Sequence, residues 1–331
     1  MLRAPLLLLA LCTALPGAWA TSAPQRAAFV GLVASVLRIE APGQRGYAMG
    51  SGVVVRADTV VTNCHVTRDA NQVFVVRGGV RWAASAQASD LARDICLLHV
   101  PGLRASPVEM VSSDALRLGQ SVTALGYTGG YGIQTSDGQV VELHRHDGAH
   151  VIQSSNWFSS GASGGGLFDD AGRLIGILTF RLRGGEAHYF AAPTDWVNEM
   201  LAKRPLADYN EVMPSKTSQV HYWQQRAPDQ PMFLKAAALL QDARWAELEA
   251  LAAQWSSLAS DDAEPWHLWG TALAKQGRLP EAQLALQCSL HLDPQRASAR
   301  PIAATTSLLA PHDVIPTPTL ATGCPVPALK P

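Results

Sequence analysis

The chain has 331 residues, which is longer than one typical domain, so we expect one unit of about 200 residues and a smaller one. Apolar residues make up 47% of the chain, charged residues 16%, and the net charge is -1. This composition excludes binding to nucleic acids or membranes through bulk charge, so partners must be recognised at specific sites.

The first 20 residues have the pattern of a secretory signal peptide. Arg3 gives a positive start, residues 6–11 are apolar, and small residues in the segment 18–20 occupy the positions that a signal peptidase reads. Pro16 breaks the apolar run, which is shorter than the roughly 20 residues that a membrane-spanning helix needs. Since no later segment is long enough either, we expect an exported mature chain without a membrane span, either periplasmic or secreted.

Short apolar runs broken by turn residues extend from about residue 27 to residue 193. They are rich in β-branched side chains and include residues 52–55, 59–62, 73–76, 121–125 and 174–178. Runs of this length and spacing predict an all-β barrel or sandwich. A helix over residues 194–203, with Thr194 as its N-cap and Pro205 just past its end, is expected to close this domain, residues 21–203.

The composition changes after this domain. Residues 204–230 contain several prolines and polar residues, which predicts an extended linker. Beyond it, alanine, leucine, glutamine, glutamate and tryptophan recur at helical spacing, and the segment at Arg244 recurs at Arg278, a shift of about 34 residues. Residues 231–306 are therefore predicted to form helical repeats, and the Pro-rich tail, residues 307–331, is predicted to be irregular.

The second helical unit resembles a tetratricopeptide (TPR) repeat. Two antiparallel helices can approach closely at the small residues Gly270 and Ala282, while Trp266, Leu273 and Leu286 fill the groove between them. An unrelated helical hairpin is the alternative, because the first unit lacks the glycine and proline landmarks.

Ser163 lies in a glycine-rich segment, residues 161–166, and is our candidate nucleophile. A serine that attacks a carbonyl needs small neighbours, because backbone amides must converge on the oxyanion that develops. Gly161 and Ser163 are expected to supply these amides. By itself, however, the segment is also typical of an ordinary turn.

Two residues at the ends of apolar strands are candidate partners of Ser163. His65 follows the apolar run at residues 60–62, where a general base can face a cleft. Asp94 precedes the apolar run 95–98, and its carboxylate can accept the proton-bearing nitrogen of His65 and fix its tautomer. Asp90 is the alternative, but an acid that enters a buried run, as Asp94 does, needs a partner.

Together these segments resemble the trypsin-like serine proteases of the chymotrypsin fold. The resemblance rests on residues 50–66, 94–98 and 161–168 and on the chain order His, Asp, Ser. Residues 151–156 and 189–193 make the chain most similar to the bacterial branch typified by the HtrA/Deg proteases. The match covers about residues 28–203.

The resemblance implies two six-stranded β-barrels, with His65 and Asp94 in the first, Ser163 in the second and the site in the cleft between them. It also implies a serine endopeptidase in which Ser163 is the nucleophile, His65 the general base and then acid, and Asp94 the residue that orients His65. The amides of Gly161 and Ser163 would form the oxyanion hole. In this chain, helical repeats occupy the place after the protease domain where the HtrA/Deg proteases have a PDZ domain. Regulation by a PDZ domain is therefore not expected for this chain.

The substrate pocket is expected to be neutral. Trp157 stands six residues before Ser163, where trypsin itself has an acid that pairs with lysine or arginine. The other expected wall residues, all neutral, are Ser159, Ser160, Leu178, Thr179, Phe180, Tyr189, Phe190 and Ala191. We therefore expect a preference for small or medium apolar side chains at P1, the residue whose carbonyl is attacked.

Four cysteines follow the signal peptide, namely Cys64, Cys96, Cys288 and Cys324. In an oxidising compartment they can form two disulfides, although spacing does not give the connectivity. Cys64 and Cys96 flank the candidate His and Asp on adjoining strands, so their side chains can meet beneath the site. Two buried thiols are the alternative for this pair. A bond between Cys288 and Cys324 would tie down the tail.

Two other functions fit parts of the sequence. The segment around Ser163 also fits the nucleophile elbow of α/β-hydrolases, with Asp195 and His221 as partners, but that fold needs a helix directly after the serine and the turn at residues 169–172 predicts a hairpin. In the second alternative function, the helical repeats bind a protein partner and the protease domain is a silent or regulated scaffold. We expect a protein or peptide substrate, and no cofactor or metal, because no motif for one is present in the sequence.

Overall fold

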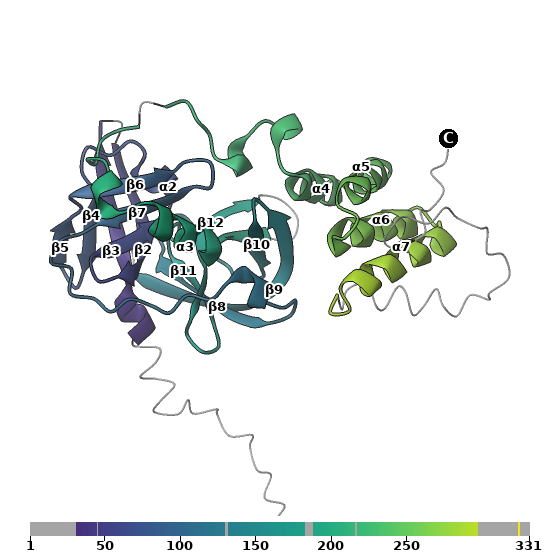
Figure 1. Cartoon of the computed structure of the whole chain (residues 1–331), viewed down its shortest axis with the longest axis horizontal. Coiled ribbons are helices and arrows are strands. Elements are labelled where there is room, and N and C mark those ends of the chain that lie inside the picture. Colours follow the sequence, from purple (N-terminus) through teal and green to yellow (C-terminus); the bar gives the residue numbers. More distant parts are fainter. Residues whose placement is uncertain are drawn as a thin grey trace, which may run out of the picture.

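The structure is a computed structural model that describes residues 31–44, 46–129, 132–182, 188–215, 217–296 and 324. The predicted signal peptide, residues 1–20, and the predicted tail apart from Cys324 lie outside the described residues. Figure 1 shows the first sheet on the left, the second in the centre and the helical unit on the right.

The first sheet contains seven antiparallel strands in the order β5-β4-β1-β2-β3-β7-β6. They are β1 (Val36–Gly43), β2 (Gly46–Arg56), β3 (Thr59–Thr62), β4 (Phe74–Arg77), β5 (Val80–Ala83), β6 (Ala86–Asp90) and β7 (Ile95–His99). The predicted strand at residues 59–62 is β3, and it pairs with β7 through Val60 opposite Leu98 and Val61 opposite Leu97. These four side chains are buried, so the hydrophobic effect holds the end of β3 beside the start of β7.

The first sheet differs from the expected six-stranded barrel because one strand is bent into two. Only Ala84 and Ser85 separate β5 from β6, and β5 pairs with β4 whereas β6 pairs with β7. At the bend, the Ala84 amide donates to the carbonyl of Val73 and the Ser85 amide donates to the carbonyl of His99, both at 2.9 Å. The backbone therefore joins the two edges of the sheet directly.

The second sheet is a closed six-stranded barrel in the order β10-β13-β12-β11-β8-β9, as expected from the resemblance. Its strands are β8 (Ser121–Tyr127), β9 (Ile133–His146), β10 (Ala149–Ser154), β11 (Gly166–Asp169), β12 (Leu174–Leu182) and β13 (His188–Pro193). Because β11 and β12 form the hairpin predicted after Ser163, with no helix directly after the serine, the hydrolase elbow is excluded.

Helix α3 (Thr194–Lys203) follows the second barrel, at the predicted position. Thr194 is not its N-cap: Pro193 occupies that position, and Thr194 is the first helical residue. The Thr194 hydroxyl donates instead to the carbonyl of Val111, at 2.5 Å. The helix thus begins with a bond to the segment that connects the two sheets.

The segment between α3 and the helical unit is tied to the first sheet along its length. Asn210 exchanges two backbone hydrogen bonds with Gln87 of β6, each 2.8 Å long, and the Ser215 amide donates to the carbonyl of Arg68 at 2.7 Å. Further on, the Tyr222 amide donates to the carbonyl of Ala92 at 2.9 Å. The predicted linker therefore runs back over the first sheet before it reaches α4, as Figure 1 shows.

The helical unit consists of two hairpins, formed by α4 (Met232–Gln241), α5 (Trp245–Leu258), α6 (Ala263–Lys275) and α7 (Leu279–Leu292). Arg244 and Arg278, the two residues related by the 34-residue shift, each precede the second helix of a hairpin. A Cβ atom at Gly270 would lie 2.6 Å from Cγ of Leu286, so the glycine allows α6 and α7 to pack closely. Within the described ranges, none of the helices has the length and apolarity needed to span a bilayer.

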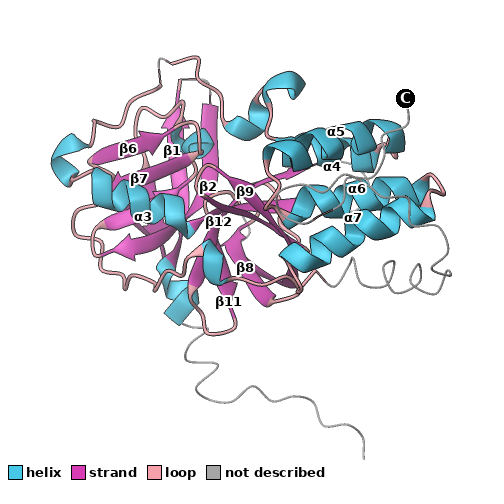
Figure 2. Ribbon diagram, turned by 45° about the vertical axis from the view of Figure 1, so that its right-hand side comes forward, coloured by secondary structure: helices cyan, strands magenta, loops and turns pink. Residues whose placement is uncertain are grey.

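The helical unit packs against β9 of the second barrel, which lies beside it in Figure 2. The ring of His144 on β9 stacks on Phe233 of α4, with 4.4 Å between ring centroids. Nδ1 of His144 is 2.8 Å from a carboxylate oxygen of Glu264 on α6, and Arg145 pairs with Asp261 at 2.9 Å. The barrel and the helices therefore share a buried boundary.

Candidate active site

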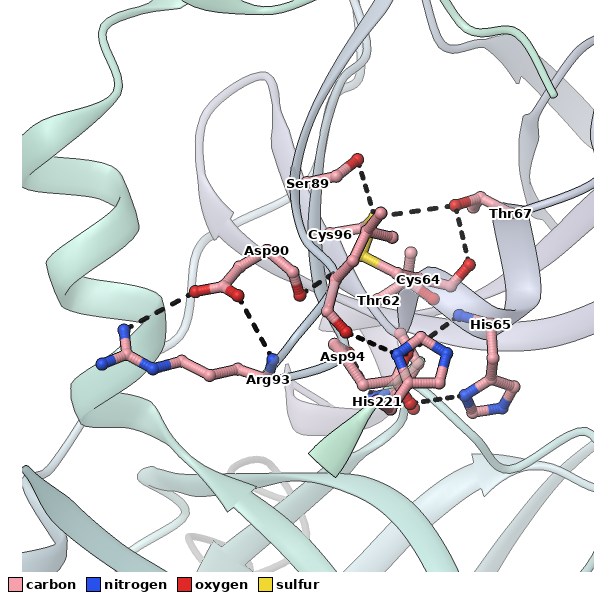
Figure 3. The surroundings of a disulfide bond; sticks show 12 residues. Thr62, Cys64, His65, Thr67, Ser89, Asp90, Arg93, Asp94, Cys96 and His221 are labelled. Carbon is pink, nitrogen blue, oxygen red and sulfur yellow. Dashed lines mark hydrogen bonds and ion pairs between the residues drawn. A yellow bond between two sulfur atoms is a disulfide. The ribbon is translucent and has the colours of Figure 1, made fainter. Parts of the chain in front are cut away.

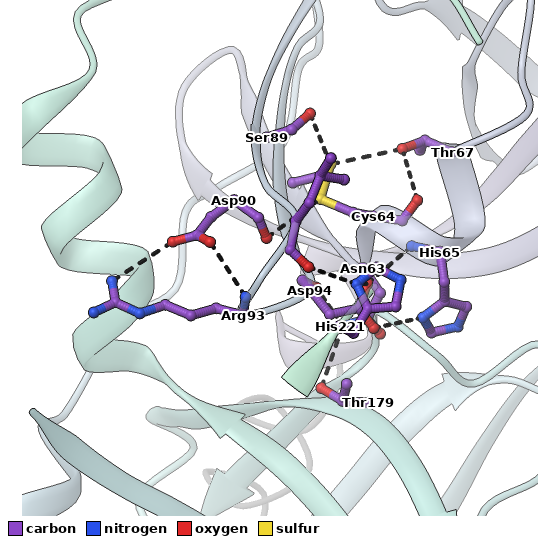
Figure 4. A network of polar contacts seen from close by, with 12 residues as sticks. Asn63, Cys64, His65, Thr67, Ser89, Asp90, Arg93, Asp94, Thr179 and His221 are labelled. Carbon is purple, nitrogen blue, oxygen red and sulfur yellow. Dashed lines mark hydrogen bonds and ion pairs between the residues drawn. A yellow bond between two sulfur atoms is a disulfide. The ribbon is translucent and has the colours of Figure 1, made fainter. Parts of the chain in front are cut away.

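His65 lies in a short helix, α2 (Cys64–Thr67), that begins directly after β3 and Asn63. Asn63 is fully buried, and its Nδ2 donates to the carbonyl of Asp94 at 2.9 Å and to Oγ1 of Thr179 at 3.2 Å. This side chain thus connects the end of β3 to the second barrel and holds the backbone next to His65 (Figure 4).

Asp94 precedes β7 in a left-handed backbone conformation, with φ at 61°, which aspartate tolerates better than most residues. Its side chain is fully buried. Oδ1 accepts the backbone N–H of His65 at 2.9 Å, and Oδ2 is 2.7 Å from Nδ1 of His65. The alternative acid, Asp90, instead accepts the amide of Arg93 at 3.2 Å.

The contact with Asp94 selects one tautomer of a neutral His65 ring. An ionised carboxylate can only accept hydrogen bonds, so a neutral ring in this position carries its proton on Nδ1 and not on Nε2. The His65 side chain is 27% exposed, whereas that of Asp94 is fully buried. The His65 ring therefore contacts a buried carboxylate on one side and is partly open to solvent.

Ser163 lies in the segment between β10 and β11, which is attached to the first sheet. The Ser51 amide of β2 donates to the carbonyl of Ser163 at 2.7 Å, and the Ser51 hydroxyl donates to the carbonyl of Gly161 at 2.8 Å. A Cβ atom at Gly50 would lie 2.7 Å from the side chain of Val66 and 3.1 Å from the carbonyl oxygen of Ser163. The serine segment and the residue after His65 thus both pack at Gly50.

The two amides expected to bind an oxyanion lie in the segment before β11. Among the described residues, neither the Gly161 nor the Ser163 N–H donates to another group, whereas the Gly164 amide donates to Leu178 at 2.8 Å. Gly161 has φ at 99°, a backbone conformation that favours glycine. These two donors therefore remain available to a ligand.

The cysteines behave as two different pairs. Cys64 and Cys96 form a disulfide, drawn in Figure 3, that joins the start of α2 to β7 beneath His65 and Asp94. Cys288 and Cys324 are free thiols. Burial and a hydrogen bond with the Cys324 thiol raise the pKa of Cys288, so its thiol is protonated at neutral pH. The second disulfide considered from the sequence is therefore not formed in this structure.

Only some of the residues expected to form the substrate pocket line the same cavity. A cavity of about 30 Å³ contains Leu178 in its wall. Its full lining is Ala124, Gly126, Thr128, Gln134, Thr135, Ser136, Trp157, Phe158, Ala162 and Leu178. Trp157 is 56% exposed, so it lies at the rim and not at the floor. Ser159, Ser160, Tyr189 and Ala191 do not line this cavity.

Three of the predicted wall residues are used elsewhere. Thr179 is buried, and its hydroxyl donates to the carbonyl of Ile177 at 2.7 Å and accepts from Asn63. Phe180 and Phe190 stack on each other with 4.6 Å between ring centroids. The sequence could not reveal this, because the bulge after Leu178 changes which face of β12 each residue occupies.

A second cavity, which the sequence does not predict, lies beside His65. Its volume is about 150 Å³, and besides His65 it is lined by Ala41, Gly46, Tyr47, Ala48, Val66, Asp69 and Ala70. These residues come from the hairpin of β1 and β2 and from the segment at α2. No motif in the chain marks them.

Asp195, named above as an alternative partner of the serine, lies elsewhere. It accepts the Ser112 hydroxyl at 2.6 Å and the Ser113 amide at 2.8 Å. Burial alone raises the pKa of Asp195, but these hydrogen bonds outweigh it and lower the pKa below its usual value. Asp195 is therefore an ionised anchor between α3 and the segment that connects the sheets.

Residues 50–177 match the family model of the trypsin-like peptidase domain. This match covers less than half of the chain. The probable periplasmic serine endoprotease DegP-like of Buchnera aphidicola subsp. Schizaphis graminum is 34% identical over 146 residues, which are 41% of this chain and 30% of that protein. The periplasmic serine endoprotease DegP of Escherichia coli strain K12 is 33% identical over 181 residues, 51% of this chain and 38% of that protein.

Among solved structures, the active form of the Rv3671c protease from M. tuberculosis is similar at 25% identity and a TM-score of 0.51, covering 63% of this chain and 100% of that one. These similarities support a serine endopeptidase of the HtrA type with the chymotrypsin-like fold. The chain spans less than half the length of the two curated relatives, and its helical unit lies outside the residues that the family model matches.

Proposed function

We propose that this chain is an exported serine endopeptidase that uses Ser163, His65 and Asp94 as its catalytic triad. The observation that carries the proposal is the buried Asp94 carboxylate, 2.7 Å from Nδ1 of a partly exposed His65, with the serine segment packed at Gly50 beside it. Export is proposed from the signal peptide pattern at residues 1–20 and from the periplasmic relatives.

The reaction proceeds through an acyl-enzyme. Oγ of Ser163 attacks the substrate carbonyl while Nε2 of His65 takes its proton, and the amides of Gly161 and Ser163 donate to the oxyanion that forms. His65 then gives the proton to the leaving amine as the C–N bond breaks. Water attacks the ester on Ser163 with His65 again as base, and His65 returns this proton to Oγ of Ser163 as the C–O bond breaks and the acid product leaves. Asp94 holds the ring in the required tautomer throughout.

The P1 side chain is proposed to be small and apolar. The cavity in front of Ala162 has a volume of about 30 Å³ and contains no charged residue in its lining. A lysine or arginine would lose its hydration there without gaining a partner. Cleavage of unfolded casein mainly after alanine or valine is expected, and exclusive cleavage after arginine would contradict this preference.

The test of the triad is covalent labelling of the purified mature chain with a fluorophosphonate probe. Label on Ser163, located by mass spectrometry of the digest, is expected in the wild type and absent in Ser163→Ala. Casein hydrolysis should be lost in the same variant. Label on another residue, or casein hydrolysis that survives in Ser163→Ala, would overturn the proposal.

A second function is proposed for the helical unit, which we take to be two TPR-like repeats that bind a protein partner or deliver substrate. The support is the equivalence of the two hairpins at Arg244 and Arg278. The alternative to an active protease is a silent scaffold whose repeats are the functional part. If cells with Ser163→Ala keep the phenotype of cells with the wild-type chain, the scaffold is favoured. If they lose both this phenotype and proteolysis, the enzyme is favoured.

A further inference from the structure

Three consecutive residues of the segment before α4 lie against the candidate dyad of His65 and Asp94. They are His221, Tyr222 and Trp223, and the latter two are part of a short 3₁₀ turn, η3 (Tyr222–Gln224). His221 is fully buried, and the Tyr222 amide bonds to the carbonyl of Ala92, two residues before Asp94. The segment is therefore anchored to the loop that carries Asp94.

His221 lies next to the Asp94 carboxylate, as Figures 3 and 4 show. Its Nδ1 is 2.7 Å from the carbonyl oxygen of Leu91 and 3.5 Å from Oδ1 of Asp94. Both neighbours are acceptors, so Nδ1 must carry a proton. This N–H donates to Leu91, and its positive end also faces Oδ1. The other carboxylate oxygen, Oδ2, is the one bonded to His65.

Trp223 connects the two histidine rings. Its ring lies nearly parallel to that of His221, with 5.6 Å between centroids and 16° between planes. It meets the ring of His65 edge-on, at 5.9 Å and 83°. It also stacks on Phe180 of β12 at 5.0 Å. Trp223 thus fixes His221 and His65 relative to the second barrel.

A purely structural role does not explain this segment well. Among the described residues, Nε2 of His221, the hydroxyl of Tyr222 and Nε1 of Trp223 are buried without a hydrogen-bond partner. Such groups lower stability, and apolar side chains of similar size would fill the space without that cost. Burial and the Asp94 charge raise the pKa of Tyr222 well above its usual value, so Asp94 meets a neutral phenol there.

We propose that His221 is a positioning residue of the protease: its Nδ1–H holds Oδ1 of Asp94 so that Oδ2 stays directed at Nδ1 of His65. The proposal rests on the function proposed above. Without this N–H, Oδ1 still accepts the backbone N–H of His65 at 2.9 Å, but the buried carboxylate loses the second positive group that faces Oδ1, and rotation about its Cβ–Cγ bond is less restricted. His65 would then lose its orientation in the step that removes the serine proton. Residues 221–223, which lead to the helical unit, are then part of the active site.

The test compares two substitutions of similar size in the full-length mature chain. In His221→Asn the side-chain amide can place an N–H near the position of Nδ1, whereas in His221→Gln it reaches toward Nε2. We expect His221→Asn to keep a kcat close to that of the wild type. We expect His221→Gln to lose about 10- to 100-fold in kcat with little change in KM. Rescue by asparagine is a result that a merely space-filling role would not give.

A proton resonance supplies the second readout. The proton between Nδ1 of His65 and Asp94 is expected to shift or broaden in ¹H NMR spectra of His221→Gln and to be unchanged in His221→Asn. Equal kcat in both variants and the wild type, or equal losses in both, would overturn the proposal. If the triad itself is wrong, the wild type shows no label on Ser163, so the two failures are distinguishable.

Trp223 keeps the proposal testable if His221→Gln does not fold. Trp223→Phe retains an aromatic ring between the two histidines, whereas Trp223→Leu removes it. We expect the leucine variant to lose kcat and to shift the His65 resonance, with the phenylalanine variant close to the wild type. An unchanged resonance and kcat in Trp223→Leu would show that the segment does not position the dyad.

Discussion

His144 on β9 and Glu264 on α6 form an ion pair inside the boundary between the second barrel and the helical unit, with 2.8 Å between Nδ1 and the carboxylate oxygen. Burial alone lowers the pKa of His144, but the charge and hydrogen bond of Glu264, together with Glu142 and Gln153, outweigh it and raise the pKa above 6.5. The helical unit is therefore attached through a histidine that binds its proton more tightly than a free histidine does.

This pair predicts a loss of stability as the pH rises. The pKa of His144 is higher in the folded state than its value of 6.5 in the unfolded state. Its protonated form therefore stabilises the fold fully at pH values below 6.5, and this stabilisation is lost as the pH rises through the folded-state pKa. We expect the Tm of the wild type to fall more between about pH 6.5 and pH 9 than the Tm of Glu264→Gln. Parallel Tm profiles would contradict this. Burial, and after it Arg296, lower the pKa of His267 to about 4, so His267 does not titrate in this window.

Asp94→Asn tests the orientation of His65. The asparagine amide can offer an N–H to Nδ1 of His65 and thereby favour the wrong tautomer of the ring. A loss of about 10⁴-fold in kcat is expected, with KM much less affected. Asp90→Asn is the matched control, because Asp90 lies four residues earlier and contacts Arg93. Comparable activity in the two variants, measured on one peptide substrate, would rule out the assigned role.

Reduction of the Cys64–Cys96 bond should destabilise the first sheet. The two residues are 32 positions apart, and closing a loop of that size stabilises a fold by about 3–4 kcal/mol in the chain-entropy model. We expect a lower guanidinium midpoint for Cys64→Ser/Cys96→Ser, and no effect of reductant on that variant. Mass spectrometry of the unfolded, unreduced wild type should find alkylation at Cys288 and Cys324 only. Alkylation of all four would disprove the pairing.

Leu178→Ala should widen the P1 preference. Leu178 is buried and lines the 30 Å³ cavity, so its truncation makes room for a leucine side chain of the substrate. The ratio of kcat/KM for leucine over alanine at P1 is expected to rise about 10-fold or more. Ile175→Ala is the control, because Ile175 is equally buried on β12 but does not line the cavity. An unchanged ratio in Leu178→Ala would place P1 binding elsewhere.

Local pattern was enough to predict the elements that carry the candidate site. The short apolar run at residues 59–62 predicts β3, and the apolar run after Asp94 predicts β7, because each strand buries its own side chains. Pairing of these strands brings His65 to Asp94, and the resemblance had implied that pair. The triad roles remain predictions until they are measured.

Features that depend on contacts between distant segments could not be predicted in the same way. Thr194 has the residue type of an N-cap, but its hydroxyl finds the carbonyl of Val111, which lies 83 residues away. The cavity at Trp157 includes only some of the expected wall residues, and Trp157 lies at its rim, because the count from Ser163 gives no information on which side chains turn inward. His221 stands in a proline-bearing segment without periodicity, so nothing in that segment indicates burial beside Asp94.

The contact between His221 and Leu91 joins residues 130 positions apart, and this has a consequence for the order of folding. Contacts of such separation form late, because the entropy of closing a long loop must first be overcome. Both sheets can assemble from residues that precede α3, but Asp94 acquires its full surroundings only once residues 221–223 have docked. A newly made chain would thus pass through a stage in which both sheets are folded and the protease is less active, which slows self-digestion until this segment is in place.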